Sequence, residues 1–116
     1  MPIPNADSAF VPPQKLRDYL LNSSHPVGGP KARWFLALGY HPSRGERLEA
    51  DLLEIVHNRS DYVEEQTRFG MKYVVRGELD SPNGTRADVQ TVWIVETNMT
   101  APRLVTAYPD EYIEHD

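Results

Sequence analysis

The sequence predicts an α+β domain in which three N-terminal helices pack on one face of a four-stranded antiparallel β-meander. Apolar residues recur at helical spacing in the first half of the 116-residue chain, and they alternate with polar residues in the second half. Two of the alternating runs are separated by Pro82-Asn83-Gly84, and Asn-Gly is typical of tight β-hairpin turns. We expect one domain over residues 1–109, followed by an acidic, flexible tail over residues 110–116.

Each predicted helix has a recognisable start or end signal. Pro12-Pro13 presets the first turn of a helix that runs to a loop rich in helix-breaking residues. Pro30 suits the first turn of the second helix, and Gly39 is a natural residue to follow its C-terminus. Ser43 and Glu46 form a capping-box pattern for the third helix. The apolar residues of the third helix follow helical spacing at Leu48, Leu52, Ile55 and Val56.

Four β-strands are predicted after the third helix. A short strand covers about residues 62–68, and alternation of apolar and polar residues predicts a second strand over 71–79. The third strand is the long run rich in β-branched residues over 86–96, after the Asn-Gly turn. The last strand covers 103–108 and is ended by Pro109.

The composition excludes several kinds of functional site. The chain has no cysteine, which excludes disulfides, thiolate zinc sites and cysteine nucleophiles. Its histidines stand too far apart for a local pair of metal ligands, and no phosphate-cradling or dinucleotide motif is present. We therefore expect no cofactor and no metal ion. No apolar run approaches the ~20 residues that span a bilayer, and residues 1–7 lack the features of a signal peptide, so we expect a cytoplasmic protein.

The net charge of −5 argues against a general nucleic-acid coat protein, but this charge is unevenly distributed. Residues 45–65 carry a net charge of −5, and the tail adds four acidic residues without a basic one. Residues 1–44 carry a net charge of +3 and residues 66–109 a net charge of +1. An anionic substrate is therefore permitted at the basic parts of the chain.

The most unusual segment is the loop and helix start from His25 to Phe35, which reads His-Pro-Val-Gly-Gly-Pro-Lys-Ala-Arg-Trp-Phe. It places an imidazole, a glycine pair and two cations, Lys31 and Arg33, close together. A cation near a helix N-terminus opposes the helix dipole, and such an exception to a local rule points to function. The alternative interpretation is a salt bridge between Lys31 and the acidic third helix.

Hydroxyl and aromatic residues are aligned on the last two predicted strands. Thr91 and Trp93 share one face of the third strand, and Thr106 and Tyr108 share one face of the fourth. Two cations stand on the adjoining strand, Lys72 and Arg76. Together these residues could form a shallow polar site, with the helices covering the opposite face of the sheet. The alternative is that threonine, tyrosine and tryptophan are simply favourable in strands.

The sequence also resembles a small bacterial family described as a domain of unknown function. The resemblance covers about residues 3–109 and rests on the motifs Pro4-Asn5-Ala6, Lys15-Leu16-x-x-Tyr19-Leu20-Leu21, His25-Pro26-Val27-Gly28-x-x-Lys31-Ala32-x-x-Phe35, Pro82-Asn83-Gly84, Thr91-Val92-Trp93-Ile94-Val95 and Pro102-Arg103-Leu104-Val105-Thr106-Ala107-Tyr108-Pro109. Members of this family occur as short stand-alone proteins, and similar segments lie at the C-termini of bacterial polymorphic toxins. The layout is similar to the barnase–EndoU–colicin–RelE group of metal-independent ribonucleases.

This resemblance implies cleavage of RNA, with tRNA among the substrates, by transesterification. A base takes the 2′-hydroxyl proton, cations stabilise the phosphorane, and an acid protonates the departing 5′-oxygen. His25 would then be the general acid or base, and Lys31 the phosphate clamp. Thr91, Thr106 and Tyr108 would orient the scissile phosphate. The residues expected to contact neighbouring parts of the RNA are Arg33, Lys72, Arg76 and Trp93.

A second hypothesis is non-enzymatic. The acidic third helix, with Glu49, Asp51 and Glu54, and the acidic tail suit an antitoxin or immunity-like protein that binds a basic partner. A ribonuclease of this kind would itself need a neutralising antitoxin or immunity protein. A third hypothesis is a binding module with a shallow pocket on its sheet.

Overall fold

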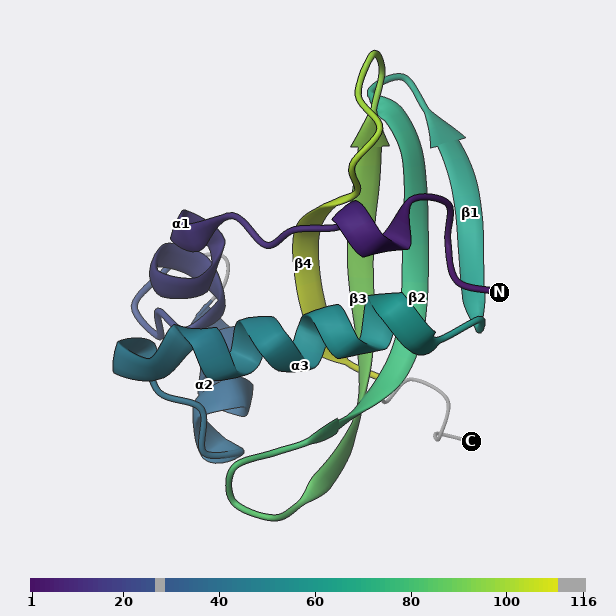
Figure 1. The fold of residues 1–116 in the computed structure, drawn as a ribbon. Helices are drawn as coiled ribbons and strands as arrows, with labels where there is room; N and C mark the ends of the chain where they lie inside the picture. The colour runs from purple at the N-terminus through teal and green to yellow at the C-terminus, as the bar shows by residue number, and fades with distance from the viewer. Residues whose placement is uncertain (27–28, 111–116) are drawn as a thin grey trace, which may run out of the picture.

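The computed structural model describes residues 1–26 and 29–110 of the chain (Figure 1). The helical segments are η1 (Ala6–Ser8), α1 (Pro13–Lys15), η2 (Leu16–Leu20), α2 (Gly29–Ala37), η3 (Pro42–Arg44) and α3 (Gly45–Asn58). The strands are β1 (Tyr62–Thr67), β2 (Gly70–Asp80), β3 (Arg86–Glu96) and β4 (Arg103–Pro109). Because η2 directly continues α1, the main helices form three segments, and the prediction of three helices followed by four strands is confirmed.

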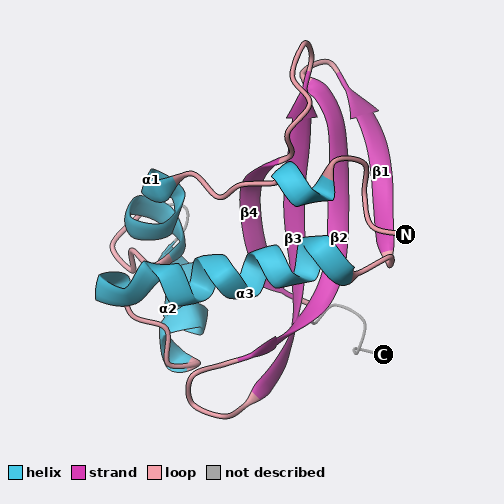
Figure 2. Ribbon diagram, in the orientation of Figure 1, coloured by secondary structure: helices cyan, strands magenta, loops and turns pink. Residues whose placement is uncertain are grey.

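The four strands form one antiparallel sheet in the order β1-β2-β3-β4, which confirms the expected meander. α3 crosses one face of this sheet, and η1 lies over the same face (Figure 2). The residues of α3 that are buried against the sheet are Leu48, Leu52, Ile55 and Val56. At Gly77 on β2, an added Cβ atom would lie 2.8 Å from Cγ2 of Ile55. Glycine at this position therefore lets α3 approach the sheet closely.

The first two helices lie beside the edge strand β4 (Figure 1). From these helices, Leu16, Leu20 and Phe35 are buried in the core. They belong to the same core cluster as Leu104 and Ala107 of β4. η2 is a π-helical turn, closed by a 2.9 Å hydrogen bond from the Leu21 N–H to the Leu16 carbonyl. Turns of this width are rare and occur frequently at functional sites. This one carries Tyr19.

The start of α3 differs from the predicted capping box. Ser43 lies in η3, where its Oγ is 2.8 Å from Nδ1 of His41 and its backbone N–H donates to the same nitrogen at 3.1 Å. α3 begins one residue later than predicted, with Arg44 as its N-cap and no side chain capping it. The capping-box prediction was wrong because Pro42 starts a short 3-10 turn that uses Ser43 before the α-helix begins.

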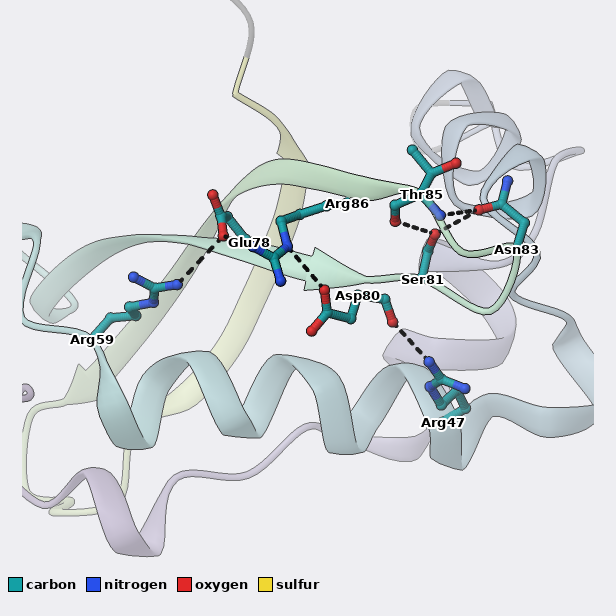
Figure 3. Close-up of polar contacts among 8 residues, drawn as sticks. All are labelled: Arg47, Arg59, Glu78, Asp80, Ser81, Asn83, Thr85 and Arg86. Atoms are coloured by element: carbon teal, nitrogen blue, oxygen red, sulfur yellow. Dashed lines mark hydrogen bonds and ion pairs between the residues drawn. The ribbon is translucent and has the colours of Figure 1, made fainter.

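The predicted hairpin between β2 and β3 is confirmed, and its turn is held by Asn83 (Figure 3). The Asn83 Oδ1 atom accepts hydrogen bonds from Ser81 Oγ at 2.7 Å and from the Thr85 N–H at 2.9 Å. The Asn83 side-chain amide donates to the Ala37 carbonyl at 3.2 Å. The hairpin turn is thereby attached to the C-terminal end of α2.

Two further contacts fix the position of this hairpin. Arg47 of α3 donates from Nη2 to the Asp80 carbonyl at 2.7 Å (Figure 3). Gly39 follows α2 with a φ of 102°, as expected for a residue after a helix C-terminus, and an added Cβ atom there would lie 3.0 Å from the Asn83 nitrogen. The hairpin, α2 and α3 therefore support one another at this end of the sheet.

The expectation that the helices cover the face opposite Thr91 and Trp93 was wrong. Both side chains are fully buried on the helix-covered face, where the Trp93 indole N–H donates to Thr91 Oγ1 at 2.8 Å. Thr106 pairs with Val92, and Tyr108 with Gln90, so these two β4 residues belong to the opposite, open face. A Trp93 side chain buries far more apolar surface than Val92 does, and this surface decides which face joins the core.

Candidate functional site

The polar cluster on the β4 edge is centred on Lys31 of α2. The Lys31 Nζ atom donates hydrogen bonds to Tyr19 Oη at 3.0 Å and to Thr106 Oγ1 at 3.3 Å. Thr106 Oγ1 in turn donates to Tyr19 Oη at 3.3 Å. η2, α2 and β4 therefore each contribute one corner of a closed triangle of polar atoms. We call these residues, together with His25 and Tyr108, the Lys31 cluster.

Aromatic rings surround the ammonium group of Lys31. The Nζ atom lies 5.5 Å from the centre of the Tyr19 ring and 5.7 Å from the centre of the Tyr108 ring. The His25 ring packs edge-on against Tyr19, with centroids 5.1 Å apart and an interplanar angle of 83°. Cation–π attraction and the hydroxyl groups together hold the cation in a fixed place. Sequence positions 25, 31, 106 and 108 are thus brought together, as the candidate roles require.

The positive charge of Lys31 is held by neutral groups. Within residues 1–26 and 29–110, no carboxylate lies at ion-pair distance from its Nζ atom. The alternative interpretation, a salt bridge between Lys31 and the acidic α3, is therefore wrong for the described residues. An ammonium that is positioned but not neutralised can attract a phosphate.

Tyr19 has an altered acidity in this setting. Burial raises the pKa of its phenol, but the hydrogen bonds from Lys31 and Thr106, with the nearby charges of Lys31 and Lys15, outweigh burial and hold the pKa below 10.0. The side chain of Lys15 lies over the same ring, 5.0 Å from its centre. Tyr19 is therefore a better proton donor than an ordinary tyrosine.

We expect Tyr19 to ionise at a lower pH than Tyr40, because burial and a hydrogen bond to the Asp51 carboxylate raise the pKa of Tyr40. An alkaline titration followed by tyrosinate absorbance checks this. Tyr19→Phe removes an early part of the absorbance rise, and Tyr40→Phe, the matched control, removes a late part. Lys31→Met shifts the Tyr19 part to higher pH. An unchanged titration in Lys31→Met contradicts the assignment.

A row of polar residues continues from the Lys31 cluster across the open face of the sheet. The Tyr108 hydroxyl donates to Gln90 Oε1 at 3.2 Å, and Gln90 Nε2 donates to Asp110 Oδ1 at 2.9 Å. Arg76 of β2 forms an ion pair with the same carboxylate, at 3.2 Å from Nε to Oδ2. Arg76, predicted to bind RNA, is thereby linked to the Lys31 cluster through Gln90 and Tyr108.

The remaining predicted site residues lie elsewhere. Thr91 and Trp93 belong to the core, where the Thr91 hydroxyl donates to the Val75 carbonyl at 2.9 Å. Arg33 is exposed on α2 and its Nη1 donates to the Ser23 carbonyl at 3.5 Å. Lys72 on β2 pairs with a glutamate of β1 at 3.3 Å. Two residues of the predicted loop, Val27 and Gly28, lie outside the described residues.

A hollow of about 420 Å³ opens beside the cluster, and it is lined by Pro12, Gln14, Lys15, Asp18, Tyr19, His25 and Arg103. It gives a ligand access to the Tyr19 and His25 rings. A second hollow, of about 430 Å³, includes Tyr40 and Arg47. There the polar groups are engaged with the protein itself, because Tyr40 Oη and Arg47 Nε both donate to Asp51 Oδ2, at 2.7 Å and 3.0 Å. The first hollow is the one that adjoins the Lys31 cluster, through Tyr19 and His25.

Tyr19, Gln90 and Asp110 were not among the predicted site residues. Tyr19 stands at helical spacing from Leu16 and Leu20, a pattern that is typical of an apolar helix face. The position of Lys31, two residues after the glycine pair, does not indicate that its partner Tyr19 comes from the preceding helix. Gln90 interrupts an apolar strand as a polar amide, and this is the sequence signal that could have pointed to it. In the structure its side chain is buried, with 8% exposure.

Two further properties of the described residues bear on function. No helix within residues 1–26 and 29–110 combines the length and apolarity that crossing a bilayer requires. The same residues contain no group of three or more histidine and acidic side chains placed to bind a metal ion.

Comparisons with known proteins place this geometry in context. A profile of the family described as "Domain of unknown function (DUF6883)" matches residues 2–111. The fold is similar to that of a chain in the solved "Contact-dependent growth inhibition toxin - immunity protein complex from Klebsiella pneumoniae 342", with a TM-score of 0.72 and 17% sequence identity. The match covers 90% of this chain and 96% of that chain, and at this identity it shows a shared fold. No curated protein sequence matches the chain.

Proposed function

The chain belongs to the DUF6883 family, and from the geometry of the Lys31 cluster we propose that it is a metal-independent endoribonuclease of toxin type. The observation that carries this proposal is the ammonium of Lys31, which Tyr19 and Thr106 hold in place without neutralising it. The fold shared with a chain of a toxin–immunity complex supports a toxin-related role. From RNA as the proposed substrate we infer that the protein acts in the cytoplasm.

The proposed reaction uses the ring nitrogen of His25 and the phenol of Tyr19 as its proton carriers. Neutral His25 takes the proton of the RNA 2′-hydroxyl, and the 2′-oxygen attacks the adjacent phosphorus. Tyr19, whose pKa lies below 10.0, gives its proton to the departing 5′-oxygen as the P–O5′ bond breaks. The products are a 2′,3′-cyclic phosphate and a 5′-hydroxyl, so the atoms and charges balance without a metal ion.

Lys31, Thr106 and Tyr108 act on the phosphate in this scheme. The Lys31 ammonium offsets the negative charge that develops on the phosphorane, and its fixed position avoids reorganisation during the reaction. Thr106 orients the scissile phosphate by a hydrogen bond, and Tyr108 confines Lys31 from the open-face side. Tyr19 holds Lys31 as well as donating the proton, which couples charge stabilisation to proton transfer.

We expect the purified protein to cleave total RNA or tRNA in excess EDTA and to leave 2′,3′-cyclic phosphate ends. His25→Ala is expected to lower the cleavage rate about a hundredfold, because general acid–base catalysis contributes at least that much. This variant, prepared in the same way, also controls for contaminating ribonucleases. Equal cleavage by both proteins, or none by the wild type across pH and salt, contradicts the proposal.

A second candidate function is binding of a protein partner, and the toxin–immunity complex of the similar structure favours it. On α3, Glu46 and Glu54 are exposed, whereas Asp51 accepts hydrogen bonds from Tyr40 and Arg47. Charge reversal at Glu46 and Glu54 therefore tests partner binding and removes only one described carboxylate hydrogen bond, from Asn58 Nδ2 to Glu54 Oε2 within α3. Loss of a protein captured from the native lysate, with RNA cleavage unchanged, supports a neutralising partner that binds α3.

A further inference from the structure

We propose that Arg76, Gln90 and Tyr108 form a second anion subsite, which takes a neighbouring phosphodiester of the bound RNA and which Asp110 of the same chain occupies when RNA is absent. The identity of the ligand rests on the proposed ribonuclease function. The existence of the subsite rests on the geometry of the open sheet face, and its test is therefore separable from the test of cleavage.

The three residues of the subsite stand side by side on adjacent strands. Arg76 of β2 pairs in register with Gln90 of β3, and Gln90 pairs with Tyr108 of β4. Because residues paired in register project to the same face, the guanidinium, the amide and the phenol line up across the sheet. Neighbouring strands are about 4.8 Å apart, which is within reach of these long side chains.

Asp110 is bound in this row as a ligand would be. Its Oδ2 atom lies 3.2 Å from Arg76 Nε, and its Oδ1 atom accepts from Gln90 Nε2 at 2.9 Å and lies 3.4 Å from Arg76 Nη2. Only 11% of the Asp110 side chain is exposed, against 33% of the Arg76 side chain. The Asp110 N–H donates to the Asp88 carbonyl at 3.1 Å, which extends the pairing of β3 with β4 by one residue.

The contacts of Asp110 are those that a phosphate oxygen pair would make. A guanidinium presents two parallel N–H donors that match carboxylate and phosphate oxygens equally well. Gln90 adds a third donor, while its Oε1 atom is engaged by the Tyr108 hydroxyl and is thereby turned away from the anion. The row therefore presents donors toward one bound anion.

Tyr108 joins this subsite to the catalytic cluster. Its hydroxyl contacts Gln90, and its ring lies over the Lys31 ammonium at 5.7 Å. Gln90 and Tyr108 thus lie between the two cations, Arg76 and Lys31. A strand of RNA whose scissile phosphate lies at Lys31 would bring an adjacent phosphate toward Arg76, where it competes with the Asp110 carboxylate.

Binding of a short 2′-deoxy oligonucleotide, followed by fluorescence anisotropy at low salt, tests this proposal independently of cleavage, because a 2′-deoxy strand cannot undergo the transesterification. Asp110→Asn is expected to bind about two- to tenfold more tightly than the wild type, as expected for removing one charge near the anion. Asp7→Asn is the control for net charge. It removes one exposed carboxylate from η1, which lies over the helix-covered face of the sheet, away from Arg76. Its affinity is expected to stay near that of the wild type.

The Arg76→Gln variant completes the test. It is expected to weaken binding, and to abolish the gain from Asp110→Asn in the double variant. Arg86→Gln, which removes an exposed cation at the hairpin, controls for overall charge. Should Asp110→Asn fail to fold by circular dichroism, Asp110→Glu is expected to keep wild-type affinity, and Arg76→Gln alone then decides the question.

The outcomes separate the two proposals. Equal affinity of the wild type, Asp110→Asn and Arg76→Gln, or equal gains from Asp110→Asn and Asp7→Asn, overturns the subsite even if RNA is cleaved. The expected affinities in a protein that does not cleave RNA support the subsite and overturn the ribonuclease function.

Discussion

Replacing Lys31 with alanine is expected to lower the rate of RNA cleavage about a thousandfold, because the variant loses the positioned cation that offsets charge on the phosphorane. The fold is expected to survive, since the Lys31 side chain is only partly buried and lies at the surface of the β4 edge. Single-turnover cleavage of tRNA in EDTA measures the rate, and circular dichroism checks the fold.

The matched control is Arg33→Ala, two residues further along α2. Arg33 is exposed, and its one described side-chain bond is a long one to the Ser23 carbonyl. We expect this variant to cleave within a few-fold of the wild type while showing the same loss of one positive charge. If both variants lose activity equally, general electrostatic attraction of RNA explains the result, and the specific role of Lys31 is wrong.

Replacing Trp93 with alanine is expected to lower the free energy of unfolding by about 3–5 kcal/mol, the range for deleting a large core side chain. Trp93 is fully buried among core residues of the sheet and the helices. Because domains of this kind are stable by about 5–15 kcal/mol, the variant is expected to lose a large share of its stability. Urea unfolding followed by circular dichroism measures the change.

Thr91→Val is the companion variant for Trp93. It keeps the size of the side chain but removes the hydroxyl that accepts from the Trp93 indole and donates to the Val75 carbonyl. A smaller loss of about 1–3 kcal/mol is expected, because buried polar atoms lose a partner. Near wild-type stability of Trp93→Ala combined with weaker RNA binding would contradict the core role and support the RNA contact that the family resemblance implied for Trp93.

The fold could be predicted because local signals agree with the tertiary structure. The Asn-Gly turn predicts a hairpin between the runs on either side of it, and the alternation of apolar and polar residues in these runs predicts the two strands. The helix of residues 45–58 was visible from the spacing of its leucines. The capping box failed because Ser43 has two competing uses, and the choice depends on the preceding Pro42 and on a side chain, His41, that the pattern does not include.

The candidate site was partly predictable, and the difference lies in how far apart its residues are in sequence. Lys31 was visible as a cation that opposes its own helix, which is a local anomaly. Its partners Tyr19 and Thr106 are set by the packing of η2 and β4 against α2, which no short pattern encodes. Whether Thr91 or Thr106 reaches the open face depends on strand pairing and on the bulge between Val92 and Trp93. Both threonines stand within predicted strands among apolar residues, so the sequence does not distinguish the buried one from the one on the open face.

The hydrogen bonds of Lys31 to Thr106 and of Thr106 to Tyr19 span 75 and 87 residues of the chain. Of the strands within the described residues, β4 emerges last during synthesis, which proceeds from the N-terminus. A nascent chain that has released every helix and the first three strands still lacks the third corner of the triangle. The Lys31 cluster therefore assembles only after β4 has left the ribosome and has docked beside η2 and α2.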